Sequence, residues 1–201
     1  MEEIMGKNNL SLKTVATYTV NTRNGFTIVE LMITLSIMAA LSSIALPSFA
    51  NIVHNGRIRA ASLQLSTTLA NSRYHALSFG VTVIVCQARD STMKHCSDSR
   101  KRNTRWSDGV ISYADLNGNN LLDEKDQILT TAQSHKSIVM VFNQNGRLRF
   151  LPNGSSRSAG FYLCSKAGNS ERHLKILYTG RTRSMAKMSD HNRQTCLSKA
   201  N

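Results

Sequence analysis

The sequence of 201 residues contains few prolines, few aromatic residues and few acidic residues. Two prolines and eleven glycines exclude collagen-like and low-complexity chains. An apolar fraction of 41% with only 18% charged residues excludes a disordered chain. Twelve acidic residues stand against 25 Lys and Arg, which gives a formal net charge of +13. This surplus indicates anionic partners such as nucleic acid, anionic lipid or an acidic polymer, and it does not indicate a fold.

Motifs for catalysis and for metal or phosphate binding are missing as well. The six histidines are scattered, with no Ser/His/Asp or Cys/His arrangement, and no glycine-rich phosphate loop is present. Cys86, His95 and Cys96 lack the Cys-x-x-Cys spacing of zinc sites. We therefore expect a protein that is not an enzyme and that has no metal site and no cofactor.

One long apolar run dominates the first quarter of the chain. Residues 31–56 contain no Asp, Glu, Lys or Arg, and 31–46 are strongly apolar. A bilayer-spanning helix needs about 20 such residues. The run is too long for an ordinary secretory signal and lacks its cleavage site. An ordinary anchor does not explain Glu30 at the apolar boundary, because a charge inside a membrane costs roughly 2.5–3.5 kcal/mol and is usually functional.

The residues before this run, Gly25-Phe26-Thr27-Ile28-Val29-Glu30-Leu31, resemble the type III signal of type IV pilins and type II secretion pseudopilins. The resemblance implies that a prepilin peptidase cleaves after Gly25 and methylates Phe26. It also implies that Glu30 is the assembly glutamate and that Pro47 is the proline of the family's helix. Paired with the N-terminal amine of a neighbouring subunit, Glu30 would specify register more than it would add stability.

The same resemblance predicts where the protein resides. Residues 1–25 are the leader, which is long, with Met5 as an alternative start. Residues 26–53 are the transmembrane and filament-core half of the N-terminal helix, and 54–201 are the periplasmic or extracellular head. The protein would cross the inner membrane once, with its head in the periplasm, and later join a pilus at the cell surface.

Apolar positions continue at helical spacing after Pro47. They recur at steps of three and four residues, and Gly80 is a plausible end: Ile58, Ala61, Leu65, Leu69, Ser72 and Ala76. We therefore predict one helix over 26–79. Its solvent-facing residues would include Arg57, Arg59, Asn71 and Arg73.

Short strands follow the helix, with Asn145-Gly146 as a hairpin signal between two of them. The candidates are 81–86, 110–114, 137–142, 147–151, 160–164, 174–179 and 181–185. The fold class is thus α+β, with a long N-terminal helix packed on a mostly antiparallel sheet, as in type IV pilins. Segments of this region resemble GspH/FimT-like minor pilins: Trp106–Gly109, Asp115–Asn119, Phe142–Gly146 and Phe150–Gly154.

The four cysteines allow three connectivities in principle. A head exported from the cytoplasm meets an oxidising compartment, where disulfides form. We expect Cys86–Cys96, which closes a short basic loop, and Cys164–Cys196, which ties the C-terminal tail to a strand.

Two polar loops have alternative interpretations. Asp115–Asp126 places oxygen ligands at several EF-hand positions, but Asn120 replaces the required glycine and Asp126 the final glutamate. We favour a connector whose Asx turns satisfy its own backbone, with calcium binding as the alternative. The loop 89–105 is basic with two acids, which favours a solvated surface loop over an accessory binding patch.

Basic residues are concentrated at the C-terminus, where 147–201 hold eleven against two acidic ones. Within this region, strand alternation places Arg181 and Arg183 on one face of Gly180-Arg181-Thr182-Arg183. Two adjacent guanidinium groups repel unless an anion lies across them, and the planar fork of Arg suits phosphate. An edge strand protected by charge is the alternative. Other basic residues lie nearby in sequence: Arg172, Lys175, Lys187 and Arg193.

The segment resembles the G-R-x-R motif of FimT-like minor pilins of natural transformation, whose arginines bind DNA. The resemblance implies a DNA site at Gly180, Arg181 and Arg183, to which we add Lys175, Arg172 and Lys187 as neighbours. The expected function is that of a minor type IV pilin that binds extracellular DNA during uptake. Its partners would be DNA, other major and minor pilins, prepilin peptidase and, before assembly, the inner membrane. The alternative is a structural minor pilin or a GspH-like pseudopilin that primes filament assembly without binding DNA.

Overall fold

The computed structural model describes residues 25–98, 101–106, 108–166 and 170–200, except for the side chains of 44–48 and 50. The chain divides into two compact units, with the division between Ile44 and Ala45. The leader predicted for 1–25 lies, apart from Gly25, outside the described residues. One helix, α1 (Ile28–Phe79), runs through 52 residues and agrees with the helix predicted over 26–79.

In the first unit, α1 starts at a threonine cap and is apolar all round. Thr27 accepts hydrogen bonds from the backbone N–H of Glu30 through Oγ1 (3.2 Å) and from that of Leu31 through its carbonyl oxygen (3.1 Å). Large apolar side chains are exposed throughout, including Phe26, Ile28, Val29, Leu31, Met32, Ile33, Leu35, Ile37, Met38 and Leu41. A helix of this kind is normally buried by other molecules.

The described residues contain no helix with an apolar stretch long enough to cross a bilayer. The membrane-spanning role of 26–53 therefore stays a prediction from the sequence.

In the second unit, one face of α1 is buried as its spacing predicts. Ile58, Leu65, Leu69 and Ala76 are at most 1% exposed, and Ala61 is partly buried. Ser72 is buried too. Its hydroxyl has partners there, because Oγ donates to the carbonyl of Thr68 and contacts Ser112 Oγ at 2.6 Å.

Arg73 does not face solvent freely, and that expectation was wrong. The residue is half-buried, and its Nε donates to the carbonyl oxygens of Gly154 and Thr179, each at 3.1 Å.

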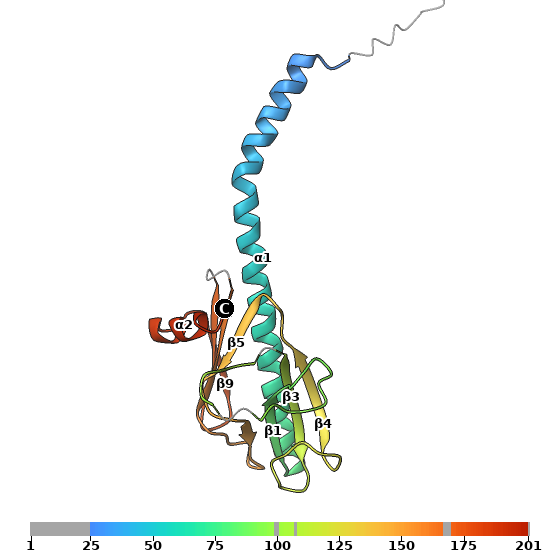
Figure 1. Cartoon of the computed structure of the whole chain (residues 1–201), viewed down its shortest axis with the longest axis vertical. Helices are drawn as coiled ribbons and strands as arrows, with labels where there is room; N and C mark the ends of the chain where they lie inside the picture. The colour runs from blue at the N-terminus through green and yellow to red at the C-terminus, as the bar shows by residue number, and fades with distance from the viewer. Residues whose placement is uncertain (1–24, 99–100, 107, 167–169, 201) are drawn as a thin grey trace, which may run out of the picture. The chain divides into compact units, whose positions relative to one another are not determined.

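The strands of the described head form two antiparallel sheets rather than the one expected. The four-stranded sheet has the order β4 (Gln127–Gln133), β3 (Gly109–Asp115), β1 (Thr82–Gln87), β6 (Leu148–Phe150). The five-stranded sheet has the order β2 (Thr104–Arg105), β5 (Ile138–Phe142), β7 (Ala159–Ser165), β8 (Glu171–Ile176), β9 (Thr182–Met185). Figure 1 shows both sheets beside the second half of α1. The sequence analysis missed β2, β4 and the short helix α2 (Asp190–Leu197).

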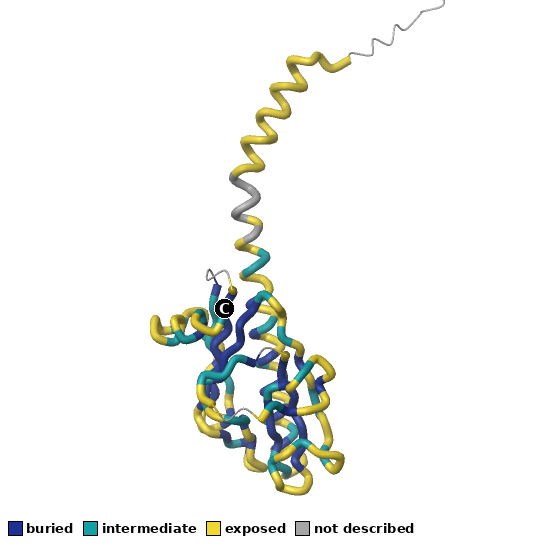
Figure 2. The backbone as a smooth tube through the Cα atoms, in the orientation of Figure 1, coloured by how far each residue is buried: buried dark blue, intermediate teal, exposed yellow. Residues whose placement is uncertain are grey.

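The main core lies between α1 and the inner faces of the two sheets. Its aromatic centre is Trp106, whose ring centroid lies 5.0 Å from those of Phe142 and Phe161. Figure 2 shows the buried residues gathered along the strands and the adjoining face of α1. Gly109, at the start of β3, allows β4 and Met93 to pack closely, because with φ +133° a Cβ would overlap Ala132 O and Met93 Cε.

Each sheet also buries part of its outer face, and each of these smaller clusters contains a disulfide. Cys86–Cys96 lies among residues such as Ile111 and Tyr113, outside the four-stranded sheet. Cys164–Cys196 ties α2 to β7, where α2 covers Val139 and Val141 of β5. Both disulfides are those predicted from the sequence.

The two disulfides should differ in what they stabilise. In the chain-entropy model, closing 32 residues (Cys164–Cys196) contributes about 4 kcal/mol and closing 10 residues (Cys86–Cys96) about 3 kcal/mol. Replacing Cys164 and Cys196 by Ala should therefore lower the free energy of unfolding by that larger amount and release α2. Hydrogen exchange should become fast at 190–197, whereas the matched Cys86→Ala, Cys96→Ala variant should keep α2 protected. Protected α2 amides in the first variant would contradict this assignment.

Candidate nucleic-acid interface

The Gly-Arg-Thr-Arg motif begins at the tight turn that joins β8 to β9. Gly180 is buried with φ +75°, and a Cβ there would overlap the carbonyl oxygen of Gly154. Its N–H donates to Leu177 O (2.8 Å), and Leu177 N–H donates to Arg181 O (2.9 Å). Arg73 of α1 holds this turn through its hydrogen bond to Thr179 O. Gly180 therefore positions the motif and offers no side chain or exposed surface to a ligand.

The register of β8 and β9 brings two basic residues together on one face. Lys175 lies directly opposite Arg183, and both are exposed. The alternate positions face α1, since Ser184 Oγ lies 3.4 Å from Ser62 Oγ and the paired Leu174 is in the main core. Arg181, also exposed, lies just before β9 and two residues from Arg183. We call Lys175, Arg181 and Arg183 the basic triplet.

Like charges directly opposite each other across two strands are destabilising. In the described part of the chain, the ion pairs are Arg89–Asp98, Arg147–Asp98 and Arg193–Glu171, and none includes a member of the basic triplet. A bound anion would therefore reduce the repulsion among the three positive charges of the triplet.

The outer face next to the triplet continues across β7 to the end of β5. Gly160 lies opposite Lys175, and Asn143 accepts the Gly160 N–H at Oδ1 (2.7 Å) and donates its own N–H to Gly160 O (3.0 Å). Arg102 Nε lies 3.5 Å from Asn143 O. Because neighbouring strands are about 4.8 Å apart, this row of residues spans about 14 Å from β9 to β5.

His173 covers the glycine in this row. A Cβ on Gly160 would lie 2.7 Å from His173 Nε2, and the His173 ring centroid lies 5.0 Å from that of Tyr162. Burial lowers the pKa of His173, and the charge of Lys175 lowers it further. His173 is thus favoured in its neutral form between Tyr162 and the basic triplet.

Two of the predicted site residues lie away from the triplet. Arg172 pairs with Leu163 of the main core, so its side chain leaves β8 on the face opposite that of Lys175. Arg172 is therefore not part of the basic triplet, because residues two apart on a strand share a face and residues three apart do not. Lys187 is exposed but lies beyond β9, next to Met188, whose N–H donates to Glu171 Oε1 (3.0 Å).

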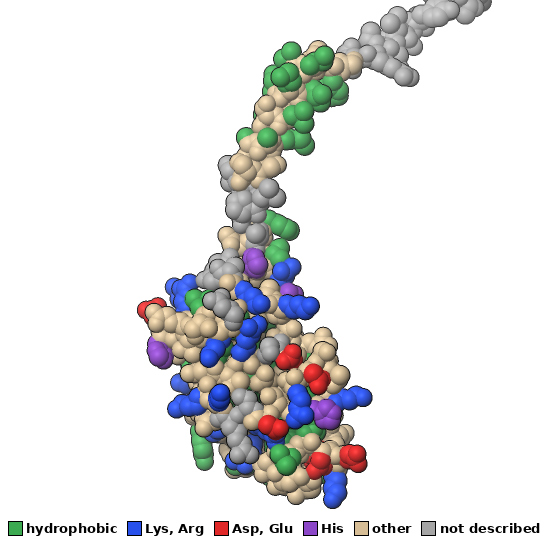
Figure 3. Space-filling model, viewed as in Figure 1, with side chains coloured by type: hydrophobic (Ala, Val, Ile, Leu, Met, Phe, Trp, Pro, Cys, Tyr) green, Lys and Arg blue, Asp and Glu red, His purple; other side chains and the backbone are tan. Residues whose placement is uncertain are grey.

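Acidic residues are sparse around the triplet. In the view of Figure 3, most acidic side chains lie on the side of β3 and β4, whereas Lys and Arg occur on both sides of the head. Glu171 lies at the other end of β8, where Arg193 binds it at 3.4 Å. The field around the triplet is therefore positive.

The loop 115–126 satisfies its own backbone. Asp115 accepts the N–H groups of Gly118 (2.9 Å) and Asn120 (3.0 Å), and Asp126 accepts those of Leu116 (3.0 Å) and Asp123 (3.1 Å). These Asx-type contacts are those that we favoured for the connector. Among the described residues, no group of His, Cys, Asp or Glu is arranged to hold a metal ion.

Sequence reasoning missed Asn143 and His173 as contributors to this face, and it considered Arg102 only as part of the loop 89–105. Each belongs to a different segment, and the pairing of β2, β5, β7 and β8 brings them into one row. The sequence shows a basic residue, Arg102, before one strand and a polar residue, Asn143, after another, but neither indicates how the strands pair.

His173 should make stability depend on pH. Its folded-state pKa lies below the ordinary value of 6.5, so below that pH the unfolded chain binds more protons than the folded chain. Stability should fall as the pH falls from about 6.5 to the lowered pKa. Between pH 7.5 and 5, the free energy of unfolding measured with urea should decrease less in His173→Gln than in the wild type. His191→Gln, on exposed α2, is the control, and an equal loss in His173→Gln and wild type would contradict the expectation.

Two protein-family models match this chain. The family model for the type II transport protein GspH matches residues 61–180, and the model for the prokaryotic N-terminal methylation motif matches residues 20–46. No curated protein is significantly similar in sequence.

Among solved structures, the chain is similar to the type IV minor pilin FimU of Pseudomonas aeruginosa PAO1. The identity is 17%, the TM-score is 0.47, and the match covers 63% of this chain and 91% of that one. It is also similar to the minor pseudopilin EpsH of the Vibrio cholerae type 2 secretion system. There the identity is 11%, the TM-score is 0.47, and the match covers 65% of this chain and 97% of that one.

The GspH model covers more than half of the chain, from the buried face of α1 to the turn at Gly180. The residues matched by the methylation motif include Gly25, Phe26 and Glu30. The chain therefore belongs to the GspH family of pilin-like proteins, whose members are structural proteins rather than enzymes.

Proposed function

We propose that this chain is a minor type IV pilin that binds extracellular DNA through the basic triplet during DNA uptake. The observation that carries the proposal is the register of β8 and β9, which places Lys175 opposite Arg183 on an exposed face without an acidic partner among the described residues. Arg181 extends this surface along the turn.

The chemistry of the triplet suits the phosphate backbone. Guanidinium groups bind two phosphate oxygens at once, and a Lys ammonium adds a point charge. Phosphate contacts carry no sequence information, so binding would be salt-sensitive and largely independent of sequence. Tyr162 is buried and His173 is half-buried, so base stacking contributes little on this face.

The N-terminal segment supports a place in a filament. Family membership and the methylation motif imply assembly with other pilins and processing by prepilin peptidase. The apolar side chains exposed on the first part of α1 would be buried by the inner membrane and later by neighbouring helices in the pilus. Glu30, in the first turn of α1, would pair with the methylated N-terminal amine of Phe26 on a neighbouring subunit.

Processing is directly measurable. We expect cleavage between Gly25 and Phe26, because the described Gly25 and Phe26 are exposed ahead of the Thr27 cap, where a peptidase can reach the bond. Mass spectrometry of the mature protein should show N-methylated Phe26 at the N-terminus. An assembled subunit that retains its leader would contradict the prediction.

DNA binding is tested by replacing both arginines of the motif. Arg181→Gln, Arg183→Gln should leave the head folded, because exposed substitutions usually change stability by no more than about 0.5 kcal/mol. DNA affinity should fall to a similar degree for all sequences. If both residues contact phosphates of a duplex, the slope of log K against log salt should decrease by roughly 0.9 for each. Transformation should fall while pilus assembly persists.

The matched control is Lys94→Gln, Lys125→Gln, which removes the same charge from exposed loops beside the four-stranded sheet. Arg172→Gln adds a second control, because Arg172 lies on β8 like Lys175 but on the opposite face of the strand. If the arginine variant binds DNA as well as the wild type, the triplet is not the site. If the wild-type chain binds no DNA at low salt, the protein is a structural minor pilin or pseudopilin.

A further inference from the structure

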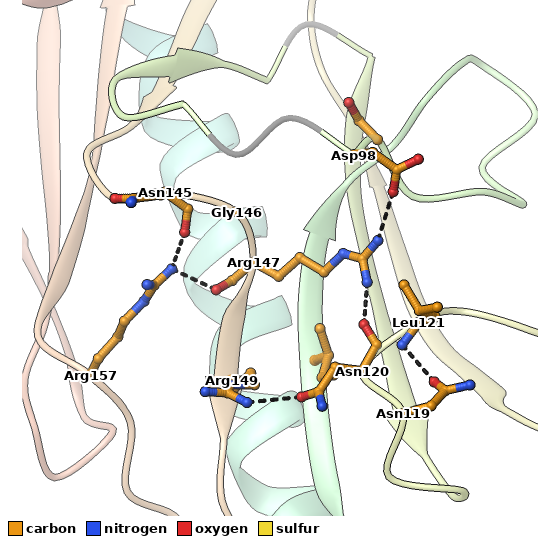
Figure 4. A pocket seen from close by; sticks show the side chains of 11 residues that line it. Asp98, Asn119, Asn120, Leu121, Asn145, Gly146, Arg147, Arg149 and Arg157 are labelled. Carbon is orange, nitrogen blue, oxygen red and sulfur yellow. Dashed lines mark hydrogen bonds and ion pairs between the residues drawn. The ribbon is translucent and has the colours of Figure 1, made fainter.

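A second basic feature lies outside the triplet, in a hollow of about 470 Å³ at the edge of the four-stranded sheet. It is bounded by the 145–146 turn, the edge strand β6 and the loop 115–126, and three arginines line it: Arg147, Arg149 and Arg157. Figure 4 shows Arg147 and Arg149 both directed toward Asn120, while Arg157 enters from the other wall. Neither the G-R-x-R motif nor any other pattern in the sequence analysis indicated this group.

The three guanidinium groups are held mostly by neutral oxygen atoms. Arg147 donates to the carbonyl oxygen of Asn120, and Arg149 Nη1 donates to Asn120 Oδ1 (2.9 Å). Arg157 Nη2 donates to the carbonyl oxygens of Asn145 (2.5 Å) and Arg147 (2.6 Å). These contacts fix the positions of the side chains but do not neutralise their charge.

The only carboxylate lining the hollow, among the described residues, is that of Asp98. Asp98 lies 3.1 Å from Arg147 Nη2, but it is also bound by Arg89 at 3.2 Å, and its side chain is 71% exposed. Neither Arg149 nor Arg157 has an ion-pair partner in the described part of the chain. The hollow therefore has an unneutralised positive charge on two sides.

Arg157 experiences this charge directly. Its pKa is lowered by burial and further by the positive charge of Arg149. The Phe142 ring, 5.7 Å from Arg157 Cζ, helps to hold the guanidinium in place despite the repulsion. An anion between Arg149 and Arg157 would remove this repulsion.

A second hollow, of about 210 Å³, adjoins the first. Arg149 and Arg157 line it too, together with Ser155, Ser156 and the exposed Tyr178. The two guanidinium groups are thus accessible from both sides. Each Arg has five N–H donors, and the hydrogen bonds to Asn120, Asn145 and Arg147 use only a minority of them.

We propose that Arg149 and Arg157, supported by Arg147, form a binding site for a phosphoryl oxyanion that is separate from the basic triplet. Donors from opposite walls suit a tetrahedral anion better than a planar carboxylate, and each guanidinium can bind two oxygens. Concave walls concentrate the positive field at this point. The phosphoryl group can belong to a free phosphate or to a nucleic-acid backbone, and the experiment separates the two sources.

The test uses the full chain in detergent, in chloride buffer at low ionic strength, titrated with inorganic phosphate by calorimetry. We expect saturable binding to the wild type. Arg149→Gln, Arg157→Gln should raise the dissociation constant for phosphate at least about tenfold. The reason is that a hydrogen bond to a charged group contributes more free energy than a tenfold change in dissociation constant represents. Arg181→Gln, Arg183→Gln is the matched control, because it removes the same charge from the triplet and should keep the saturable phosphate binding at the hollow, including its loss when Arg149→Gln is added.

Arg157 also holds the 145–147 turn, so its replacement can disturb folding. Arg149→Gln alone therefore provides the decisive second variant, because Arg149 is exposed and donates its hydrogen bond to the side chain of Asn120. It should keep the thermal midpoint of the wild type and still weaken phosphate binding, and Arg149→Lys should restore only part of the affinity. No saturable phosphate binding by the wild type, or unchanged binding by Arg149→Gln, would overturn the proposal.

The source of the phosphoryl group follows from competition in the Arg181→Gln, Arg183→Gln background. If a short DNA duplex displaces phosphate there, the site takes a nucleic-acid backbone. If only inorganic phosphate and nucleoside monophosphates compete, it takes a small molecule. Both results support an oxyanion site, and neither depends on DNA binding by the triplet.

Discussion

The head depends on the burial of a single stripe of α1 against two sheets. Ile58, Leu65, Leu69 and Ala76 lose nearly all their exposure to this contact, and the aromatic group around Trp106 fills the space between the sheets. The stripe packs against both sheets at once and is shielded from water, so a polar residue on it needs a hydrogen-bond partner within the protein. Ser72 shows this, because its hydroxyl contacts Ser112 of β3 at 2.6 Å inside the core.

The same contact explains the form of the Gly-Arg-Thr-Arg motif. Arg73 projects from α1 to the carbonyl oxygens of Gly154 and Thr179, which brings two turns together. Their backbones approach so closely that Gly180 has no room for a Cβ. The glycine is therefore required by packing, whereas the arginines that follow it remain exposed and available. A short motif can thus combine one structural residue with two residues for binding.

The outer faces of the sheets divide the basic residues into groups with different surroundings. On the five-stranded sheet, α2 and its disulfide cover Val139 and Val141, while the row from Asn143 to Arg183 lies at the other end of the same strands. On the four-stranded sheet, the loop 115–126 uses its own carboxylates for its turns. Among the residues that the structure describes, Asp98 is the one carboxylate that lines the hollow with the arginines. The basic residues therefore form two groups, and Tyr178, in the turn that precedes Arg181, lines the second hollow beside Arg149 and Arg157.

The sequence by itself determined the helix, most strands, both disulfides and the N-terminal signal, because these follow from local spacing, turn chemistry and compartment. It did not determine that there are two sheets, nor did it reveal β2 and β4, since a two-residue strand and a polar strand carry little periodic signal. Only the tertiary structure placed Lys175 opposite Arg183, moved Arg172 to the other face, and gathered Arg147, Arg149 and Arg157 around one hollow. The physical reason is strand register, because a shift of one residue reverses the face of every side chain, and register is set by contacts between segments far apart in the sequence.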